Sequence, residues 1–388
     1  MKITNLKVTG FRSLKNIDWR PGDLNIVIGP NAAGKSNLLD ILLMLSCLPK
    51  GDLGNYVQSR GGLLPLLWDG KAKSISVQIG LDFSLEVGKE GWEHSRYSLD
   101  LVPSGGLGSY EIADERLVSD GTDRAYSRAG ALAFDAVRGE TPAAQQVKRD
   151  ESFLSNARTV ALFGSDYLVK FAELMSKWNI YQMIDTSLSA DVRKAPVARY
   201  ETEVASDGSN LVSVLHTLYT ENKAFAQRVD AAMRAAFENF EELVFPPSPA
   251  AHQRVQMNVR WKDLERACPL SDLSDGTLRF LYLIAILTNP YLPPLVKIDE
   301  PETGLHPRMM GIVAECAMDA ATRTQLILTT HSPEFLDAFR DTQPTVTVTE
   351  LVDGATQLRT LSGEDLAYWL KEYTLGDIYR TGQLESME

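Results

Sequence analysis

Residues 24–48 combine three patterns that few folds can accommodate together. An apolar run at 24–28 is typical of a buried strand, the loop Gly29-Pro30-Asn31-Ala32-Ala33-Gly34-Lys35-Ser36 follows it, and an apolar stretch over 37–48 is typical of a helix. In a G-x-x-x-x-G-K-S loop between strand and helix, glycines let backbone N–H groups wrap a phosphate, and the helix N-terminus adds its positive dipole end. A chance glycine-rich turn is the alternative, and the flanking strand and helix argue against it. The pattern therefore predicts an α/β nucleotide-binding fold.

This loop also predicts which residues contact the nucleotide. Lys35 would reach the β- and γ-phosphates, and the Ser36 hydroxyl would ligate Mg²⁺. The candidate contacts are Gly29, Pro30, Asn31, Ala32, Ala33, Gly34, Lys35, Ser36 and Asn37. The expected ligands are ATP and Mg²⁺.

A second apolar run, LVKI at 295–298, ends in two adjacent acids, Asp299 and Glu300. Carboxylates at the carboxyl end of a buried parallel strand lie where open α/β sheets bind ligands. Two buried charges are costly unless a metal or a reaction requires them. An acidic loop after a strand is the alternative when this stretch is taken alone, so its interpretation depends on the other motifs.

Two further stretches supply those motifs. Ser274 and Gly276 lie in S-D-G before the apolar helix LYLIAILTN, at a helix N-terminus that can bind an anion. A simple cap is the alternative for S-D-G. The apolar strand at 325–330 ends at His331, for which a structural role is the alternative.

Composition limits the class of protein. The 388-residue chain has a net charge of −12, so DNA binding would need a local basic face or one assembled by two subunits. Cys47, Cys268 and Cys316 are scattered, which fits a reducing cytoplasm. The N-terminus shows no leader pattern, and no uninterrupted apolar window reaches membrane-spanning length. We expect a cytoplasmic protein with no membrane partner.

The order of patterns predicts three lobes. Residues 1–150 would form an N-terminal lobe with the phosphate loop and an antiparallel β-meander, with loops over 51–70 and 120–150. Residues 151–245 would form a helical insertion, and 246–388 a C-terminal lobe with S-D-G, the acid pair and His331. The first and third lobes would build one head, and an amphipathic tail helix is expected near the end.

These four motifs, in this order, resemble the ATP-binding-cassette (ABC) ATPases. The matching positions are Lys35 and Ser36 for the Walker A motif, 273–276 for the signature, Asp299 for the Walker B aspartate, Glu300 for the catalytic glutamate and His331 for the switch histidine. Asp275 departs from the family pattern, because it replaces the first of the two signature glycines. The resemblance implies an α/β P-loop fold of ABC-ATPase type, with an N-terminal antiparallel β subdomain and a helical insertion.

Local sequence further resembles the RecF-like ATPases, relatives of the chromosome-maintenance and overcoming-lysogenization-defect (OLD) ATPases. The similarity lies in GFRSL at 10–14, DEPETGLHP at 299–307 and THSP at 330–333. Transporter ATPases usually lack the Leu-His-Pro after the acid pair. OLD nucleases carry a further nuclease domain after the switch histidine; only 55 residues follow Pro333 and they show no suitable acid cluster, so we expect no built-in nuclease.

The resemblance implies a role for each matched residue. Ser36 and Asp299 would hold Mg²⁺, Glu300 would polarise the attacking water, and Lys35 and His331 would stabilise charge on the γ-phosphate. Ser274 and Gly276 would act in trans, on nucleotide held by a second subunit, so that ATP joins a homodimer.

Two assignments stay open at this point. Arg12 would approach the nucleotide from the N-terminal strands, or else is an ordinary surface arginine. Gln78, Gln145 and Gln146 are candidates for the family's Mg²⁺-sensing glutamine, and the sequence does not choose between them.

The leading functional hypothesis is ATP-dependent, dimerisation-coupled action in DNA repair or anti-phage defence. Its candidate partners are DNA and a separate effector protein such as a nuclease. One alternative is a nucleotide-gated scaffold with little turnover that recruits an effector. Another is a transport ATPase subunit, for which the apolar loop GGLLPLLWDG would dock a membrane partner, although packing of this loop in the core is the preferred interpretation.

Overall fold

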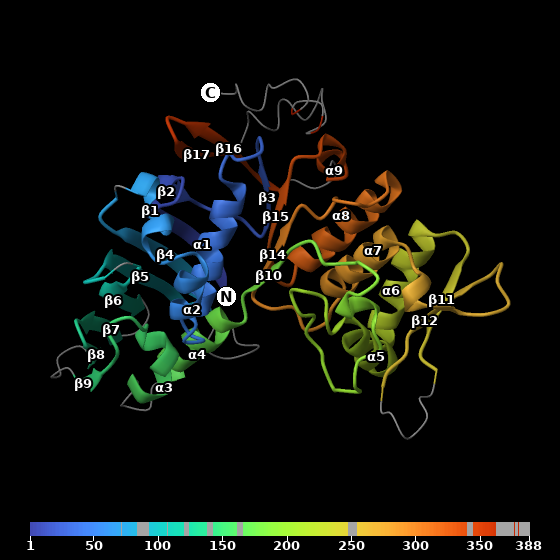
Figure 1. The fold of residues 1–388 in the computed structure, drawn as a ribbon, viewed down its shortest axis with the longest axis horizontal. Helices are drawn as coiled ribbons and strands as arrows, with labels where there is room; N and C mark the ends of the chain where they lie inside the picture. The colour runs from blue at the N-terminus through green and yellow to red at the C-terminus, as the bar shows by residue number, and fades with distance from the viewer. Residues whose placement is uncertain are drawn as a thin grey trace. The chain divides into compact units, whose positions relative to one another are not determined.

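Figure 1 shows the chain in a computed structural model, with helices and strands labelled in chain order. The structure describes residues 1–70, 72–83, 93–106, 108–119, 124–137, 143–160, 166–246, 254–339, 344–361, 376 and 379. The chain forms two compact units, each built from separate segments. Unit 1 comprises Met1–Asn179, Pro293–Val296 and Thr345–Gly363, and unit 2 comprises Ile180–Leu292, Lys297–Pro344 and Glu364–Glu388.

An eight-stranded antiparallel sheet dominates unit 1, with strand order β2-β1-β4-β5-β6-β7-β8-β9. The strands are β1 (Lys2–Phe11), β2 (Leu14–Trp19), β4 (Ile75–Phe83), β5 (Glu93–Pro103), β6 (Tyr110–Ser119), β7 (Arg124–Ala129), β8 (Leu132–Val137) and β9 (Ala143–Gln146). Alternate residues of β4 are buried, from Ile75 to Phe83, because successive strand side chains point to opposite faces. Phe83 contacts Tyr167 and Phe171 of helix α4 (Asp166–Ser176), so this helix covers the apolar face.

The phosphate loop lies on a second set of strands in unit 1. Strand β3 (Leu24–Ile28) is buried throughout and pairs in parallel with β16 (Thr345–Val352), which pairs antiparallel with β17 (Ala355–Leu361). A strand buried on both faces is expected for a parallel neighbour. Helix α1 (Lys35–Cys47) follows the loop and contacts α2 (Leu53–Ser59) and α4.

The prediction of loops over residues 51–70 and 120–150 of unit 1 is wrong. Residues 51–70 contain helix α2 and the short 3-10 helices Leu64–Leu66 and Trp68–Gly70, whose leucines are too closely spaced to reveal a single period. Residues 120–150 contain β7, β8 and β9, which pair as consecutive antiparallel neighbours. Small and polar residues in these strands hide the alternation on which a strand prediction rests.

Unit 2 is mainly helical, and its strands include the two that end in the predicted site residues. Its elements are β10 (Asn179–Tyr181), α5 (Leu211–Glu221), α6 (Lys223–Ala236), β11 (Phe240–Val244), β12 (Asn258–Trp261), β13 (Cys268–Pro269), α7 (Asp275–Leu287), β14 (Leu295–Asp299), α8 (Pro307–Ala321), β15 (Gln325–Thr330) and α9 (Pro333–Asp337). The first residue of β10 and the first two of β14 are assigned to unit 1. In sheet order, β10, β14 and β15 are neighbours. Helix α7 is buried along most of its length, as its apolar sequence predicts.

The boundaries between the two units differ from the boundaries expected between the three lobes. Residues 151–179 belong to unit 1 and residues 180–245 to unit 2, so the expected helical insertion is shared between them. The roles expected of the three lobes stay predictions. The expected tail helix lies outside the described residues except for residues 376 and 379. Within the described part of the chain, no helix has both the length and the apolar composition of a membrane span.

Candidate functional site

The phosphate loop of unit 1 has the backbone conformation that its glycines predict. Gly34 lies at φ 101° and caps helix α1, and Ala32 also has a positive φ, of 66°. A side chain at Gly34 would place its Cβ 2.0 Å from the Thr356 hydroxyl, so glycine is required both for its conformation and for space. The Thr356 hydroxyl donates to the carbonyl of Ala33 at 3.0 Å, which joins strand β17 to the loop.

Lys35 lies across this loop. Its side chain is almost fully buried, and its Nζ donates to the carbonyl oxygens of Gly29 (2.6 Å) and Pro30 (3.0 Å). These two carbonyl oxygens hold the lysine ammonium inside the loop, and an ammonium is a compact point charge of the kind that binds phosphate. Ser36 follows in the first turn of α1, where the helix dipole also favours an anion.

The structure brings Arg12 to the helix that follows the phosphate loop. Its guanidinium lies 3.1 Å from the carboxylate of Asp40 in α1 and donates at 3.4 Å to the Asn37 side chain. Arg60 binds the same carboxylate at 2.6 Å. Asn37 in turn donates to the Ser13 hydroxyl at 2.6 Å. Arg12 is thus part of a network that orients α1, and its predicted contact with nucleotide stays a prediction.

In unit 2, the two acids at the end of β14 are held by the neighbouring strand β15. The Thr329 hydroxyl donates to Asp299 Oδ1, and no described residue donates to Asp299 Oδ2. The Glu300 backbone N–H donates to Thr329 at its carbonyl (3.2 Å) and its hydroxyl (3.1 Å). Thr329 therefore fixes both acids, and an oriented carboxylate oxygen is the ligand type that Mg²⁺ prefers.

The structure brings Glu300 and His331 together, and their catalytic roles stay predictions. The Glu300 backbone has φ 46°, a conformation that is uncommon outside glycine and turns the chain sharply after the strand. The His331 Nδ1 lies 3.3 Å from the Glu300 carboxylate. Both side chains are partly exposed, the histidine at 48% and the glutamate at 33%, so water can reach them.

Glu302 is a site residue that sequence reasoning missed. Its side chain is only 5% exposed, and its Oε1 accepts hydrogen bonds from the Thr330 hydroxyl and from the His331 backbone N–H at 3.3 Å. The same oxygen lies 3.9 Å from His331 Nδ1. Burial raises the pKa of the Glu302 carboxyl above its ordinary value. The position of Glu302, two residues after the acid pair, could have suggested a role in the site. Its contacts with Thr330 and His331 could not be predicted, because the sequence does not show that these segments are neighbours.

The predicted signature begins helix α7. The Ser274 hydroxyl accepts from the Thr277 backbone N–H at 3.2 Å, so the cap expected from S-D-G is present. A Cβ at Gly276 would lie 3.1 Å from the Gly304 carbonyl, so the start of α7 packs against the loop that follows the acid pair. Ser274 and Gly276 are thus placed at a helix N-terminus, and their contact with a partner's nucleotide stays a prediction.

A second missed residue is Gln182, which follows β10. Together with Asp299 and Glu300 it lines a small cavity of about 20 Å³, which Arg279 also borders. Its amide oxygen is a further oxygen ligand of the type that Mg²⁺ accepts. A glutamine one residue after a short apolar strand was the available signal, but β10 spans only three residues and was not recognised.

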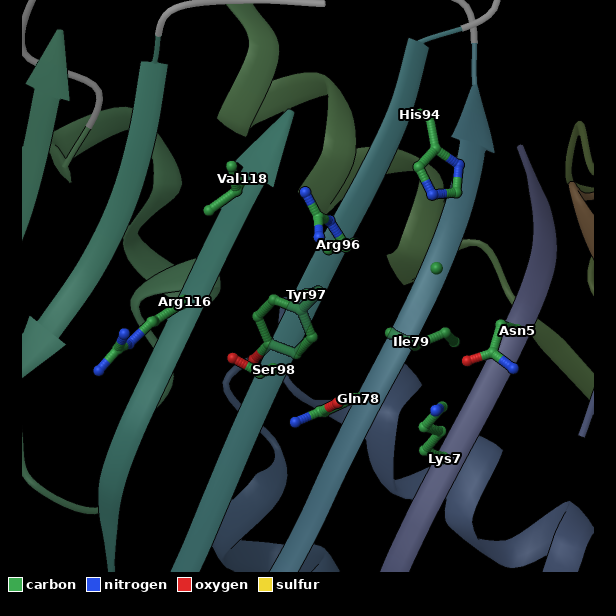
Figure 2. Close-up of a pocket in the computed structure, with 11 residues that line it drawn as sticks. Asn5, Lys7, Gln78, Ile79, His94, Arg96, Tyr97, Ser98, Arg116 and Val118 are labelled. Carbon is green, nitrogen blue, oxygen red and sulfur yellow. The ribbon is translucent and has the colours of Figure 1, made fainter. Parts of the chain in front are cut away.

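The other glutamine candidates lie elsewhere. Figure 2 shows Gln78 on β4 among Lys7, Ser98 and Arg116, in a groove of about 510 Å³ on the eight-stranded sheet. None of residues 29–37 lines this groove. Gln145 and Gln146 end strand β9, at the far edge of the same sheet from β1. Gln182, in contrast, shares a cavity with the acid pair, and which glutamine would sense Mg²⁺ stays a prediction.

The fold and the motifs define this chain as a RecF-like P-loop ATPase of the ABC type, similar in fold to chromosome-maintenance (Smc) heads. The model of the AAA_21 family, "AAA domain, putative AbiEii toxin, Type IV TA system", matches residues 24–337, and the chain belongs to this family. The predicted ABC-type fold, RecF-like relationship and ATPase activity are confirmed.

Individual relatives agree with this assignment. An "ATP/GTP phosphatase" of Helicobacter pylori (strain ATCC 700392 / 26695) is 21% identical over 345 residues, which cover 86% of each chain. The "DNA replication and repair protein RecF" of Moorella thermoacetica (strain ATCC 39073 / JCM 9320) is 50% identical over 44 residues, 11% of this chain and 12% of RecF.

Solved structures are similar in fold over nearly the whole length. An Smc head bound to the C-winged helix domain of ScpA gives a TM-score of 0.58 at 15% identity, covering 95% of this chain and all of the other. The Smc head with an extended coiled coil bound to the C-terminal domain of ScpA, derived from Pyrococcus furiosus, gives 0.59 at 13% identity, covering 95% and 98%. These likenesses concern the fold alone.

Proposed function

We propose that this chain is a Mg²⁺-dependent ATPase whose two copies join around ATP and separate after hydrolysis. The observation that carries the proposal is the trio Asp299, Glu300 and His331, held together by the hydrogen bonds of β15 and by Glu302. Such an arrangement separates three tasks: metal binding, activation of water and stabilisation of phosphate charge.

The donor set suits magnesium. In unit 2 the Asp299 carboxylate and the Gln182 amide both offer oxygen, and Mg²⁺ is bound by few protein oxygens together with phosphate and water. That the Ser36 hydroxyl of the phosphate loop is a further ligand rests on the resemblance to the ABC ATPases. When bound, the ion would neutralise charge on the β- and γ-phosphates. Lys35 supplies a second positive charge from the phosphate loop, and Glu300 accepts a proton from the attacking water.

The position of the signature at a capped helix N-terminus supports the proposed dimerisation. Ser274 and the N–H groups at the start of α7 can receive an anion, and under this proposal the anion is the γ-phosphate held by a second copy. Two Smc heads of similar fold have been solved bound to domains of a partner protein, ScpA. By analogy, we propose that the ATP-bound dimer acts on DNA or on a separate effector protein, in repair or in anti-phage defence.

The test is Glu300→Gln. The amide keeps the size of the carboxylate but cannot accept the proton, so hydrolysis should fall by roughly 10²–10⁴-fold while ATP binding survives. Light scattering with saturating Mg·ATP should then report a stable dimer, and adding Ser274→Arg should dissociate it. A Glu300→Gln protein that stays monomeric with ATP bound would contradict the proposal. A dimer that forms with ATP although the wild type hardly turns over would favour the scaffold alternative.

A further inference from the structure

Arg193 occupies an unusual position for an arginine. It ends the 3-10 helix Asp191–Arg193 in unit 2, and its side chain is only 5% exposed. Arginine is rarely buried unless its donors are satisfied. Here the donors are satisfied almost entirely by one short segment, the residues that lead into the signature.

The contacts of Arg193 converge on that segment. Its Nη1 donates to the carbonyl oxygens of Leu273 (2.8 Å) and Ser271 (3.0 Å), and its Nη2 contacts the Asp275 carboxylate at 2.7 Å. A guanidinium presents its donors in a rigid fork, so these bonds fix the path of the chain on both sides of Ser274. The Ser274 side chain is then free to cap α7, as observed.

Arg193 also connects this segment to the one that follows Gln182. Its Nε donates to the carbonyl oxygen of Thr186 at 2.8 Å. Thr186 lies four residues after Gln182, which lines the cavity with Asp299 and Glu300. The Arg193 guanidinium therefore links the signature segment to Thr186, in the loop that follows Gln182.

The negative charge of Asp275 suggests why Arg193 is held against this segment. Asp275 stands between Ser274 and Gly276, and its side chain is 61% exposed. A carboxylate at this position would repel a phosphate that approaches the same helix N-terminus. Arg193 places a fixed positive charge against that carboxylate from the protein side.

We propose that Arg193 is a positioning residue that holds the signature loop and neutralises Asp275, so that a second copy's ATP can dock there. The docking part of this inference rests on the proposed function, whereas the holding of the loop does not. Arg193 acts through Asp275 and the loop carbonyls, and it has no direct part in hydrolysis.

The first arm of the test measures the loop itself, in nucleotide-free protein. Arg193→Gln should raise hydrogen–deuterium exchange of the amides at 271–277 by about 10-fold, because several charge-assisted hydrogen bonds are lost. The matched control is Arg323→Gln at the opposite end of α7, where Arg323 donates to the carbonyl of Leu287 (3.2 Å) and pairs with Asp319 (3.1 Å). This control should leave exchange at 271–277 unchanged. Equal exchange in Arg193→Gln and wild type would overturn the proposal.

The second arm measures docking, with each variant carried in the Glu300→Gln background. Arg193→Gln should raise the protein concentration needed for the ATP-bound dimer by about 10-fold, with ATP affinity of the monomer unchanged, because an uncompensated Asp275 then faces the phosphate. Adding Asp275→Asn should restore dimerisation, at least in part. A purely structural arginine predicts no such rescue, so absence of rescue would overturn the charge role.

A third variant serves if Arg193→Gln does not fold. Asp275→Asn alone keeps Arg193 and removes an exposed carboxylate, so the ATP-bound dimer should form at equal or lower protein concentration than in its parent. Weaker dimerisation of Asp275→Asn would overturn the charge role. If the parent Glu300→Gln protein itself never dimerises, the proposed function fails together with the docking role, and the exchange measurement still decides whether Arg193 holds the loop.

Discussion

The phosphate loop in unit 1 presents its lysine to backbone carbonyls, whereas the acidic strand end in unit 2 presents its carboxylates to side chains of a neighbouring strand. Lys35 bonds to Gly29 and Pro30, both within six residues of it. Asp299 and Glu300 instead depend on Thr329, about thirty residues further along the chain. The first arrangement is local and the second requires the tertiary fold, so they should respond differently to substitution.

The largest effect is expected from a substitution that removes the local arrangement, the lysine of the phosphate loop. Lys35→Ala removes the buried ammonium, and ATP turnover should fall by roughly 10²–10³-fold or more because one charge-stabilising donor is lost. Steady-state phosphate release and ATP binding by the purified variant measure this. Lys7→Ala, at an exposed ion pair with Asp18 on the same unit, is the control and should change neither. Unchanged ATP turnover in Lys35→Ala would show that the phosphate loop takes no part in hydrolysis.

A second prediction separates backbone conformation from packing at the phosphate loop. Gly34→Ala should lower the free energy of unfolding by about 1–3 kcal/mol, because it forces a side chain into a positive φ and against Thr356. Combining it with Thr356→Ala removes the clash with Thr356 but leaves the conformational strain and an approach of 3.0 Å to the Ser13 hydroxyl. Because Thr356→Ala alone loses the bond to Ala33, the double variant is compared with that single variant. Urea unfolding of both variants should therefore show partial recovery in the double variant. Full recovery would mean that the left-handed conformation costs nothing here.

The third prediction concerns pH at the acidic site. The pKa of Glu302 is raised by burial above 4.5, so the folded protein binds a proton more tightly than the unfolded chain does. Its contribution to stability is therefore most favourable below pH 4.5 and declines as pH rises from there through the raised pKa. Glu302→Gln cannot ionise, so its stability relative to wild type should increase over that pH interval. Urea unfolding of both proteins from pH 4 upward would show this, and a constant difference would contradict it.

The smallest expected effect is at Arg12. Asp40 keeps Arg60 as a partner when Arg12 is replaced, and Arg12 is itself partly exposed. Arg12→Gln should therefore lower unfolding stability by only about 0.5–1 kcal/mol, as for other partly exposed ion pairs. A much larger loss of ATP affinity than of stability would indicate a direct contact between Arg12 and nucleotide, and would sharpen its assignment.

The same contrast explains what could be predicted from the sequence. The phosphate loop could be read directly, because its function lies in backbone conformation encoded by consecutive residues such as Gly34 and Lys35. The end of β14 could also be read, because an apolar run stops abruptly at Asp299. Glu302 and Gln182 could not, because their partners lie far away in the chain or on a strand too short to recognise. Strands β7 to β9 were missed because small and polar residues hide their alternation.

One feature of unit 1 bears on how the protein is made. The loop that follows β3 is completed by strands β16 and β17, whose Thr349 and Thr356 donate to Ile28 and Ala33 across more than 320 positions. At typical synthesis rates of about 5–20 residues per second, the motif leaves the ribosome roughly 15–65 s before those threonines do. During that interval the nascent chain carries the complete phosphate-loop sequence without the strand that supports it. We expect ATP affinity to appear late in synthesis, so translation itself would delay the first encounter with nucleotide until the C-terminal strands have joined the fold.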